Sequence, residues 1–485
     1  MVFSSYIFLF YFLPLALLIY YASLGRAKNV FLTLLSYLFY GWANPAFVVL
    51  MFASTTVDFF CGLVIARPAG LDDAGRPKLL AQKAERSRAQ RVALIVSITS
   101  NLSLLAFFKY FNFGIENYNS LVEMLGLGQL QWETFFRVTL PLGISFYTFQ
   151  SMSYSIDVYR GDARAVRSYT DFSCYVTMFP QLVAGPIVRF HEVANQLQHR
   201  NHTSEKFARG VAFVSLGMAK KILIANPCGK IADVCFDAGS REMLDAWYGL
   251  FAYSFQIYFD FSAYSDMAIG LGLFFGFVFP KNFDSPYKSK SITEFWQRWH
   301  LSLSHFLRDY LYIPLGGNRK GDGRTYVNLA MVMLLGGLWH GASWNFVAWG
   351  GIHGGMLAFE RLQGKDSIYR SLPDPLRVAL TFVIASFAWV FFRSETIGGA
   401  GDYLLSMFGL GSAASGASLL GTIIHQPYYF FSFAVACVFA WFMPQTWDFT
   451  RQLTWTKVAW CFAALYVAIA VMTTQEYNPF IYFIF

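Results

Sequence analysis

One histidine interrupts a run that is otherwise apolar and rich in glycine. The run reads LLGGLWHGASWN, and the histidine is His340. An imidazole titrates near neutrality, so it can take a proton from a hydroxyl group and return it to a leaving group. Burial favours the neutral imidazole, the form that a general base needs. Gly336, Gly337 and Gly341 would let another backbone or a thin ligand approach closely. The run therefore predicts a base for acyl transfer in a tunnel; the simpler alternative is a histidine hydrogen-bonded between two helices.

A second set of reactive side chains lies in the polar but aromatic-rich region 281–325. Ser291 followed by Glu294 is typical of a helix N-terminus, and Pro314 ends the pattern, so we expect one helix over about 292–312. The alternative is an amphipathic helix that only anchors the chain at the membrane interface. On one face the helix would place four side chains at i, i+4 spacing: Trp296, His300, Ser304 and Arg308.

Two aspartates, Asp260 and Asp266, stand in the apolar stretch YFDFSAYSDMAIG. Ionisable residues in membrane segments are costly and mark ion pairs, proton paths or binding sites. We expect these two to form structural hydrogen bonds, to pair with arginines or to line a proton path. Further along, Arg319, Lys320 and Arg324 would hold the phosphates of a soluble donor at the cytoplasmic face, or would only set the membrane topology.

No residue pattern predicts a metal site. The six cysteines lie mostly in apolar runs and form no C-x-x-C pair, which favours buried small side chains. The stretch HEVAN lacks the second histidine of a zinc-protease motif, because Asn195 occupies that position. We expect neither a metal nor a permanently bound cofactor.

The elements that must position these side chains are predicted to be membrane helices. Of the 485 residues, 56% are hydrophobic and 14% are charged, whereas soluble proteins carry about 25% charged residues. The stretch FPQLVAGPIVRF, broken by proline and glycine, predicts a re-entrant turn buried in protein. Apolar runs of roughly 20 residues, long enough to cross a bilayer, predict about a dozen membrane-embedded segments: 3–23, 29–43, 46–66, 92–112, 137–157, 172–189, 207–226, 245–260, 264–280, 327–360 (one or two), 376–392, 428–444 and 454–472.

The loops indicate how the chain is oriented. Loop 67–91 carries seven Lys and Arg against three acidic residues, which places it in the cytoplasm by the positive-inside rule. The net charge of +8 therefore reflects membrane topology rather than nucleic-acid binding.

We expect residues 1–485 to form a single membrane domain, because no polar stretch is long enough to fold alone. Within it, 281–325 is an amphipathic region that carries His300, and 327–360 is the membrane segment that carries His340. The sequence has no internal repeat of the kind that transporters contain, which makes a non-enzymatic transporter the weaker alternative.

Several long motifs resemble the membrane-bound O-acyltransferase (MBOAT) family. SITEFWQRWHLSLSHFLRDYLYIPLGGNRKG followed by LLGGLWHGASWNFVAWGGIHG is similar to the paired histidine motifs of that family. PLGISFYTFQSMSYSIDVYRG, FPQLVAGPIVRF and YFDFSAYSDMAIGLGL resemble its bacterial polysaccharide-acetylating branch, as do the opening MVFSS and the closing NPFIYFIF. The resemblance covers nearly the whole chain.

What the resemblance implies is an all-α polytopic membrane protein with its helices around a central tunnel. It also implies that acetyl-CoA in the cytoplasm donates an acetyl group that is delivered towards the periplasm. The motif histidines of the family map onto His340, expected to be the general base, and onto His300, expected to position the donor or an intermediate. Further candidates for donor binding or tunnel lining are Trp296, Arg298, Trp299, Ser304, Arg308, Asp309, Asn318, Trp339, Asp260 and Asp266.

The resemblance further implies an O-acetyltransferase of the bacterial inner membrane that acts on an extracytoplasmic, alginate-like exopolysaccharide. Its expected partners are acetyl-CoA, membrane lipid, the polysaccharide and a periplasmic acetyltransferase or acetyl-carrier protein, but not nucleic acid. Gln297 stands where the alginate type has a second arginine before Arg298, and Gln181 where it has histidine. The acceptor therefore stays open, with O-acetylation of peptidoglycan or cellulose, or D-alanyl transfer from a carrier protein, as alternatives.

Overall fold

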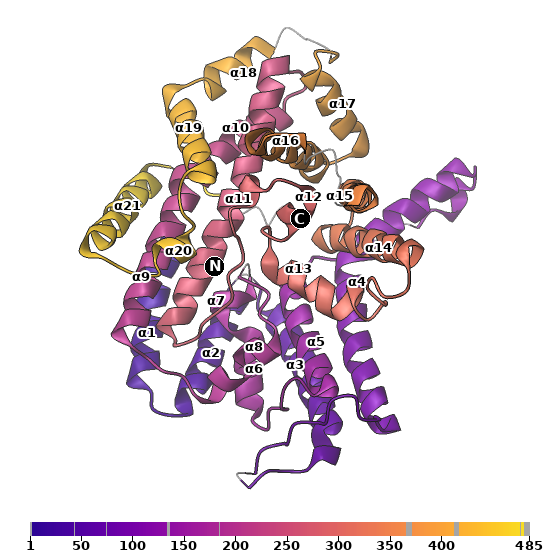
Figure 1. The fold of residues 1–485 in the computed structure, drawn as a ribbon, viewed down its shortest axis with the longest axis vertical. Coiled ribbons are helices and arrows are strands. Elements are labelled where there is room, and N and C mark those ends of the chain that lie inside the picture. Colours follow the sequence, from indigo (N-terminus) through magenta and orange to yellow (C-terminus); the bar gives the residue numbers. More distant parts are fainter. Residues whose placement is uncertain are drawn as a thin grey trace. The chain divides into compact units, whose positions relative to one another are not determined.

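The regular structure of the chain is helical. The computed structural model describes residues 2–42, 44–73, 75–132, 136–183, 185–364, 371–411, 417–475 and 477–479. Within those ranges the one strand-like feature is an isolated bridge between Leu71 and Pro77. The all-α prediction is therefore confirmed for the described residues (Figure 1).

The contacts of the chain divide it into two compact units. Unit 1 comprises Met1–Phe207 and Leu271–Phe279, and unit 2 comprises Ala208–Gly270 and Pro280–Phe485. Both histidine motifs belong to unit 2. That the whole chain forms a single membrane domain stays a prediction.

Unit 1 combines apolar helices with buried polar contacts. Asp58 accepts hydrogen bonds from Ser97 Oγ at 2.5 Å and from Asn101 Nδ2 at 2.8 and 2.9 Å, which compensates for burying the Asp58 carboxylate. The predicted break in FPQLVAGPIVRF is present, and its short helix α7 is buried. The main helices are α1 (Leu13–Ala22), α2 (Ala27–Gly41), α3 (Ala46–Ala66), α4 (Arg88–Met124), α5 (Ile144–Arg160), α6 (Tyr169–Thr177), α7 (Phe179–Leu182) and α8 (Phe190–Gln198).

Unit 2 contains most of the predicted site residues, and two of its helices, α9 and α11, continue across the boundary with unit 1. Figure 1 shows α13 and α14 as neighbouring helices of this unit. The helices are α9 (Ser204–Ala219), α10 (Asn226–Phe236), α11 (Met243–Phe274), α12 (Ile292–Trp296), α13 (Leu301–Leu307), α14 (Asp322–His340), α15 (Trp344–Gln363), α16 (Asp374–Arg393), α17 (Ile397–Met407), α18 (Ala417–Ile424), α19 (Pro427–Trp441), α20 (Thr446–Phe449) and α21 (Trp455–Thr474).

Four helices of the described residues are long and apolar enough to cross a bilayer: Ala46–Ala69, Arg88–Met124, Asp374–Arg393 and Trp455–Thr474. Ile7–Ala22 and Pro427–Trp441 are shorter apolar helices. The predicted segments 245–260 and 264–280 are wrong as two segments, because α11 continues from Met243 to Phe274. The residues between them include neither proline nor glycine, so nothing there interrupts the helix.

Glycines let α14 and α15 pack backbone to backbone. A Cβ on Gly337 would collide with the carbonyl oxygen of Phe346, and one on Gly350 with that of Met333. A Cβ on Gly341 would overlap the Phe346 ring. Gly337 and Gly341 therefore make room for α15. The space beside them is filled by Phe346, and not by a thin ligand.

The single helix predicted over 292–312 is wrong. The chain forms α12 and α13 instead, and His300 between them has φ +44° and ψ +56°, a left-handed conformation. The N-terminal signal is correct, since Ser291 Oγ accepts from the Glu294 amide at 3.1 Å. The Glu294 carboxylate, however, accepts from the Lys290 amide at 2.8 Å rather than closing the capping box on Ser291.

The break at His300 has a tertiary cause. The backbone at Asn282 and Asp284 forms hydrogen bonds with the residues on both sides of His300. The Asp284 amide donates to the Arg298 carbonyl at 2.9 Å, and the Leu301 amide donates to the Asn282 carbonyl at 2.8 Å. These bonds replace helical ones, so Trp296 and His300 do not lie one turn apart on a common face. After α13 the chain continues through a π-helical turn, Arg308–Tyr312.

Candidate active site

His340 ends a helix face that lines a cavity. The cavity holds about 340 Å³ and is bounded by residues of α12, α13, α14 and α15. On α14 the lining residues follow helical spacing, so they form one face of that helix over several turns: Leu329, Val332, Met333, Gly336 and His340. His340 is the last residue of that face and of the helix.

The imidazole of His340 sits among aromatic rings. Its centroid lies 5.3 Å from that of Trp349 on α15, 5.2 Å from that of Phe392 on α16 and 5.0 Å from that of Trp339. Only 9% of His340 is exposed. An imidazole that lines a cavity with little access to water is suited to proton transfer in a protected site.

His300 is completely buried beside this cavity rather than in its lining. Its Nδ1 lies 3.2 Å from Asn282 Oδ1, which also accepts from the Ser302 amide and hydroxyl. Asn282 Nδ2 in turn donates to Ser265 Oγ at 2.8 Å. Because the carbonyl oxygen of the Asn282 amide can only accept, Nδ1 of His300 carries the proton. Nε2 then holds a lone pair, and it has no hydrogen-bond partner among the described residues.

Trp339 is a neighbour of both histidines. Its ring centroid lies 6.2 Å from that of His300 and 5.0 Å from that of His340. Both predicted histidines are therefore neighbours of the same side chain, Trp339, although they come from different elements. Their roles in the reaction stay predictions.

Helix α15 fixes the position of α12 through two polar contacts that the sequence analysis missed. The Glu360 carboxylate accepts from the Ile292 amide at 2.6 Å, from the Thr293 amide at 2.8 Å and from the Thr293 hydroxyl at 2.6 Å. One turn of α12 further on, Trp296 Nε1 donates to His353 Nδ1 at 3.3 Å. Polar residues in a membrane segment were a signal for both Glu360 and His353, but their partners are far away in sequence.

The other predicted site residues divide into two groups. Trp296, Ser304 and Arg308 line the cavity together with His340, even though the predicted helix is broken. Outside the lining, Trp299 is a core residue stacked on Phe295, Arg298 pairs with Glu294 at 2.8 Å, Asp309 pairs with Arg308 at 2.7 Å, and Asn318 is exposed.

The two aspartates of α11 form ion pairs, which was one of the alternatives, but their partners are lysines rather than arginines. Lys221 Nζ lies 2.6 Å from Asp260 Oδ1, and Lys220 Nζ lies 2.7 Å from Asp266 Oδ2. Thr446 also donates to Asp266 at 2.7 Å. Neither aspartate lines the cavity at His340, so a role in the tunnel stays a prediction.

The comparisons with known proteins give the family of the chain. The MBOAT, membrane-bound O-acyltransferase family, matches residues 128–392, which include both histidines. The chain is 46% identical to the probable alginate O-acetylase AlgI of Pseudomonas aeruginosa over 85% of the chain and 76% of that protein. The chain belongs to the membrane-bound O-acyltransferase family. It is a membrane-bound enzyme that transfers acyl groups to hydroxyl groups.

Two further relatives bear on the acceptor. The probable alginate O-acetylase AlgI of Pseudomonas putida is 41% identical over the full length of both chains. The peptidoglycan O-acetyltransferase of Helicobacter pylori is 36% identical over 84% of this chain and 80% of that protein. The MBOAT resemblance expected from the sequence is thus confirmed.

His300 predicts a specific dependence of stability on pH. Burial lowers the pKa of His300 from 6.5 to about 3, so the unfolded chain binds a proton there at pH values at which the folded chain does not. Stability contributed by neutral His300 is present above pH 6.5 and falls by up to about 1.4 kcal/mol per pH unit as pH decreases from there towards 3. We expect His300→Gln to remove this part of the slope.

The measurement is the thermal midpoint of the detergent-solubilised protein between pH 5 and 7.5. The wild-type midpoint should fall towards pH 5 more steeply than that of the His300→Gln variant. Parallel curves for the two proteins would show that His300 is not held neutral by burial.

Glu360 predicts a link between the fold and the cavity. Glu360→Ala leaves the Ile292 and Thr293 amides without their acceptor, and the loss at the buried Ile292 amide costs about 1–3 kcal/mol. We expect a lower thermal midpoint and a raised KM for the acyl donor, because α12 supplies Trp296 to the cavity. Glu360→Gln keeps one acceptor oxygen, so its thermal midpoint and KM should lie between those of the wild-type protein and those of Glu360→Ala. The exposed Glu205 offers the control variant Glu205→Ala; an equal loss there would contradict a specific role of Glu360.

Proposed function

We propose that this MBOAT protein takes an acetyl group from cytoplasmic acetyl-CoA and delivers it across the bacterial inner membrane for O-acetylation of an extracytoplasmic polysaccharide, alginate or an alginate-like polymer. The observation that carries the proposal is the cavity that ends at His340. Its apolar α14 face suits a pantetheine arm, and Ser304 and Arg308 add polar groups. The relatives named as alginate O-acetylases support the acceptor class.

The chemistry that this arrangement supports is direct acyl transfer. His340 accepts the proton of a hydroxyl group while that oxygen attacks the thioester carbonyl carbon. The carbon–sulfur bond breaks, and the imidazolium returns the proton to the departing thiolate, so free CoA and an ester result. Neutral His300, which is buried beside the cavity, would position the donor or an intermediate through Trp339, the neighbour of both histidines.

The charge distribution of unit 2 supports the direction of transfer. Arg319, Lys320 and Arg324 precede or begin α14, and Arg361 ends α15, where it lies 3.6 Å from Asp322. The positive-inside rule assigns this end of the two helices to the cytoplasm. His340 lies at the opposite end of α14, so the cavity would lead the donor from the cytoplasmic side into the membrane. The proposal includes a central tunnel among about a dozen membrane-embedded segments. It also includes an acceptor partner, which would be a periplasmic acetyltransferase or acetyl-carrier protein.

The test uses purified protein in lipid nanodiscs with acetyl-CoA labelled in the acetyl group. Free CoA and labelled ester are measured after addition of a uronic-acid oligomer, a peptidoglycan fragment or a cello-oligosaccharide, each with and without membrane-free periplasmic extract. We expect CoA release and preferential labelling of the uronic-acid oligomer. Labelling of the peptidoglycan fragment alone would favour that acceptor. A reaction with a D-alanyl carrier protein but not with acetyl-CoA would overturn the proposed donor.

A further inference from the structure

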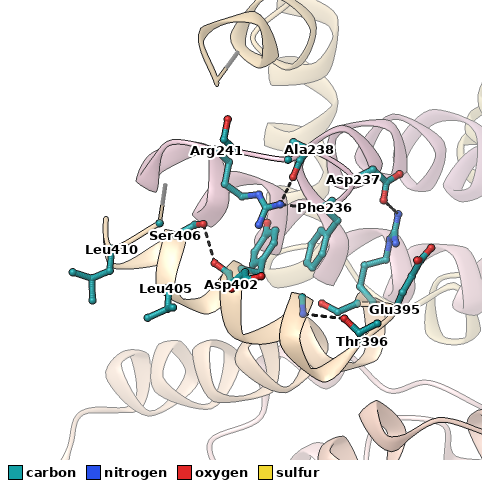
Figure 2. Close-up of a pocket in the computed structure, with 17 residues that line it drawn as sticks. Phe236, Asp237, Ala238, Arg241, Glu395, Thr396, Asp402, Leu405, Ser406 and Leu410 are labelled. Carbon is teal, nitrogen blue, oxygen red and sulfur yellow. Dashed lines mark hydrogen bonds and ion pairs between the residues drawn. The ribbon is translucent and has the colours of Figure 1, made fainter. Parts of the chain in front are cut away.

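A second cavity lies in unit 2, and the acyl-transfer chemistry described above makes no use of it. It holds about 740 Å³ and is formed by the end of α10, the loop to α11, the end of α16 and α17 (Figure 2). Its lining is mostly polar, unlike that of the cavity at His340, and includes Arg241, Arg393, Glu395, Asp402 and Ser406.

This polar cavity lies at the end of the bundle where His340 is found. The Asn345 side chain at the start of α15 donates to the Ser394 carbonyl at the end of α16. The ring centroid of Phe392 lies 5.2 Å from that of His340, and the next residue, Arg393, lines the polar cavity. The last turn of α16 therefore contacts the His340 ring with one residue and lines the polar cavity with the next.

This end carries fewer basic residues than the donor end. Arg241 and Arg393 lie here, against Arg319, Lys320, Arg324 and Arg361 at the donor end. The positive-inside rule compares Lys and Arg, and it therefore assigns this end to the side away from the cytoplasm. The polar cavity thus opens on the side where the acetyl acceptor is expected.

The two guanidinium groups of the cavity differ in their partners. Arg393 is compensated by Asp233 and Asp237, each at 2.9 Å. Arg241 donates instead to the backbone carbonyls of Ala238 and Phe236. Among the described residues no carboxylate lies within ion-pair distance of Arg241, and its Nε has no hydrogen-bond partner. A guanidinium without a carboxylate is a receptor for one, because its planar fork matches carboxylate geometry.

Aromatic rings hold both guanidinium groups in place. Phe236 and Tyr403 stack with centroids 3.9 Å apart at an angle of 10°. Arg241 lies 4.6 Å from the Tyr403 centroid, and Arg393 lies 5.6 Å from that of Phe236. Figure 2 shows Arg241 close to Phe236 in the cavity lining. A receptor that is fixed before binding loses little entropy when its ligand arrives.

The other polar groups of the cavity suit sugar hydroxyls. Glu395 and Asp402 are exposed carboxylates that can accept hydrogen bonds. The hydroxyls of Ser406 and Thr396 are already engaged by backbone groups, Ser406 Oγ donating to the Asp402 carbonyl at 2.9 Å and Thr396 Oγ1 accepting from the Gly399 amide at 3.0 Å. One carboxylate receptor beside free carboxylate acceptors fits a sugar that carries both an acid group and hydroxyls.

We propose that this polar cavity binds a uronic-acid residue of the acceptor polymer, with Arg241 as the receptor for its carboxylate. This inference rests on the proposed function and names where the acceptor is held. Binding there places a polymer next to the α16 turn that contacts His340, and selects carboxylated sugars over neutral ones.

The experiment measures binding of a uronic-acid hexamer to the full chain in nanodiscs by calorimetry. The matched ligand is the same hexamer with its carboxyl groups reduced to alcohols. We expect the uronic-acid hexamer to bind at least tenfold more tightly than the reduced hexamer. Arg241→Gln should remove most of that preference, and Arg451→Gln, a change at an exposed arginine outside the cavity, should leave it intact.

A second variant separates binding from folding. The Cβ position of Gly239 in the cavity lining meets no atom within 4 Å, so Gly239→Trp adds a bulky side chain to the lining without a clash at Cβ. We expect it to abolish hexamer binding while the thermal midpoint and the affinity for acetyl-CoA remain at wild-type values. Equal affinity for both hexamers, or unchanged binding in Arg241→Gln and Gly239→Trp, would overturn the inference. If the wild-type protein released no CoA from acetyl-CoA, that result would instead refute the proposed function.

Discussion

His340→Ala will reduce acetyl transfer from acetyl-CoA by about 10²–10⁴-fold, the range that a general base contributes. The imidazole ends the α14 face of the cavity and is enclosed by Trp349 and Phe392, so bulk water cannot easily replace it as a base. The loss should appear in kcat, whereas the affinity for acetyl-CoA should change little, because the lining of the cavity stays in place. Label transfer and CoA release are measured on the purified protein.

The control for this variant is His199→Gln, a change at an exposed histidine of unit 1. It should retain wild-type turnover. His340→Gln keeps a polar side chain of similar size but cannot accept and return a proton at neutral pH, so it should be as impaired as His340→Ala. Wild-type turnover in either His340 variant would leave His340 with a structural role only, the hydrogen-bonded histidine that the sequence also allowed.

What the sequence could predict was whatever depends on local pattern. Apolar runs predicted helices, and Ser291 predicted the start of α12, because these follow from burial and capping within a few residues. His340 was found for the same reason, as a costly polar group in an apolar run, whereas the role of His300 came from the family resemblance. The cavity that includes Trp296, Ser304 and Arg308 follows in part from that spacing, since α13 and its π-helical turn keep the last two on one side.

What could not be predicted depends on contacts between distant segments. His300 takes a left-handed conformation because the backbone at Asn282 and Asp284 pairs with the residues around it. Glu360 reaches α12 from the far end of α15, and nothing near it in sequence indicates that contact. The meaning of Gly337 was ambiguous for the same reason, since only the position of α15 shows that a backbone, rather than a ligand, fills the space.

The buried pair of Lys221 and Asp260 should give the largest loss of stability in unit 2. Each side chain is only 1% exposed, and the two charges lie 2.6 Å apart; Lys221 also donates to the Pro479 carbonyl. Lys221→Met leaves the Asp260 carboxylate buried without its counter-ion, which costs about 3–5 kcal/mol. We expect a strong fall in thermal midpoint. Lys220→Met is the matched control, because Thr446 still donates to Asp266 and the pair is less buried.

A double variant decides what the pair does. Lys221→Met combined with Asp260→Leu removes both charges, and replacement of a buried ion pair by apolar side chains is often neutral or stabilising. If the pair is structural, the double variant should recover both the thermal midpoint and acetyl transfer. If Asp260 serves the acyl tunnel, as the sequence suggested, the double variant will be stable but inactive. The ratio of activity to folded protein therefore separates a structural pair from a functional one, and recovery of both would assign Asp260 to the fold rather than to the reaction.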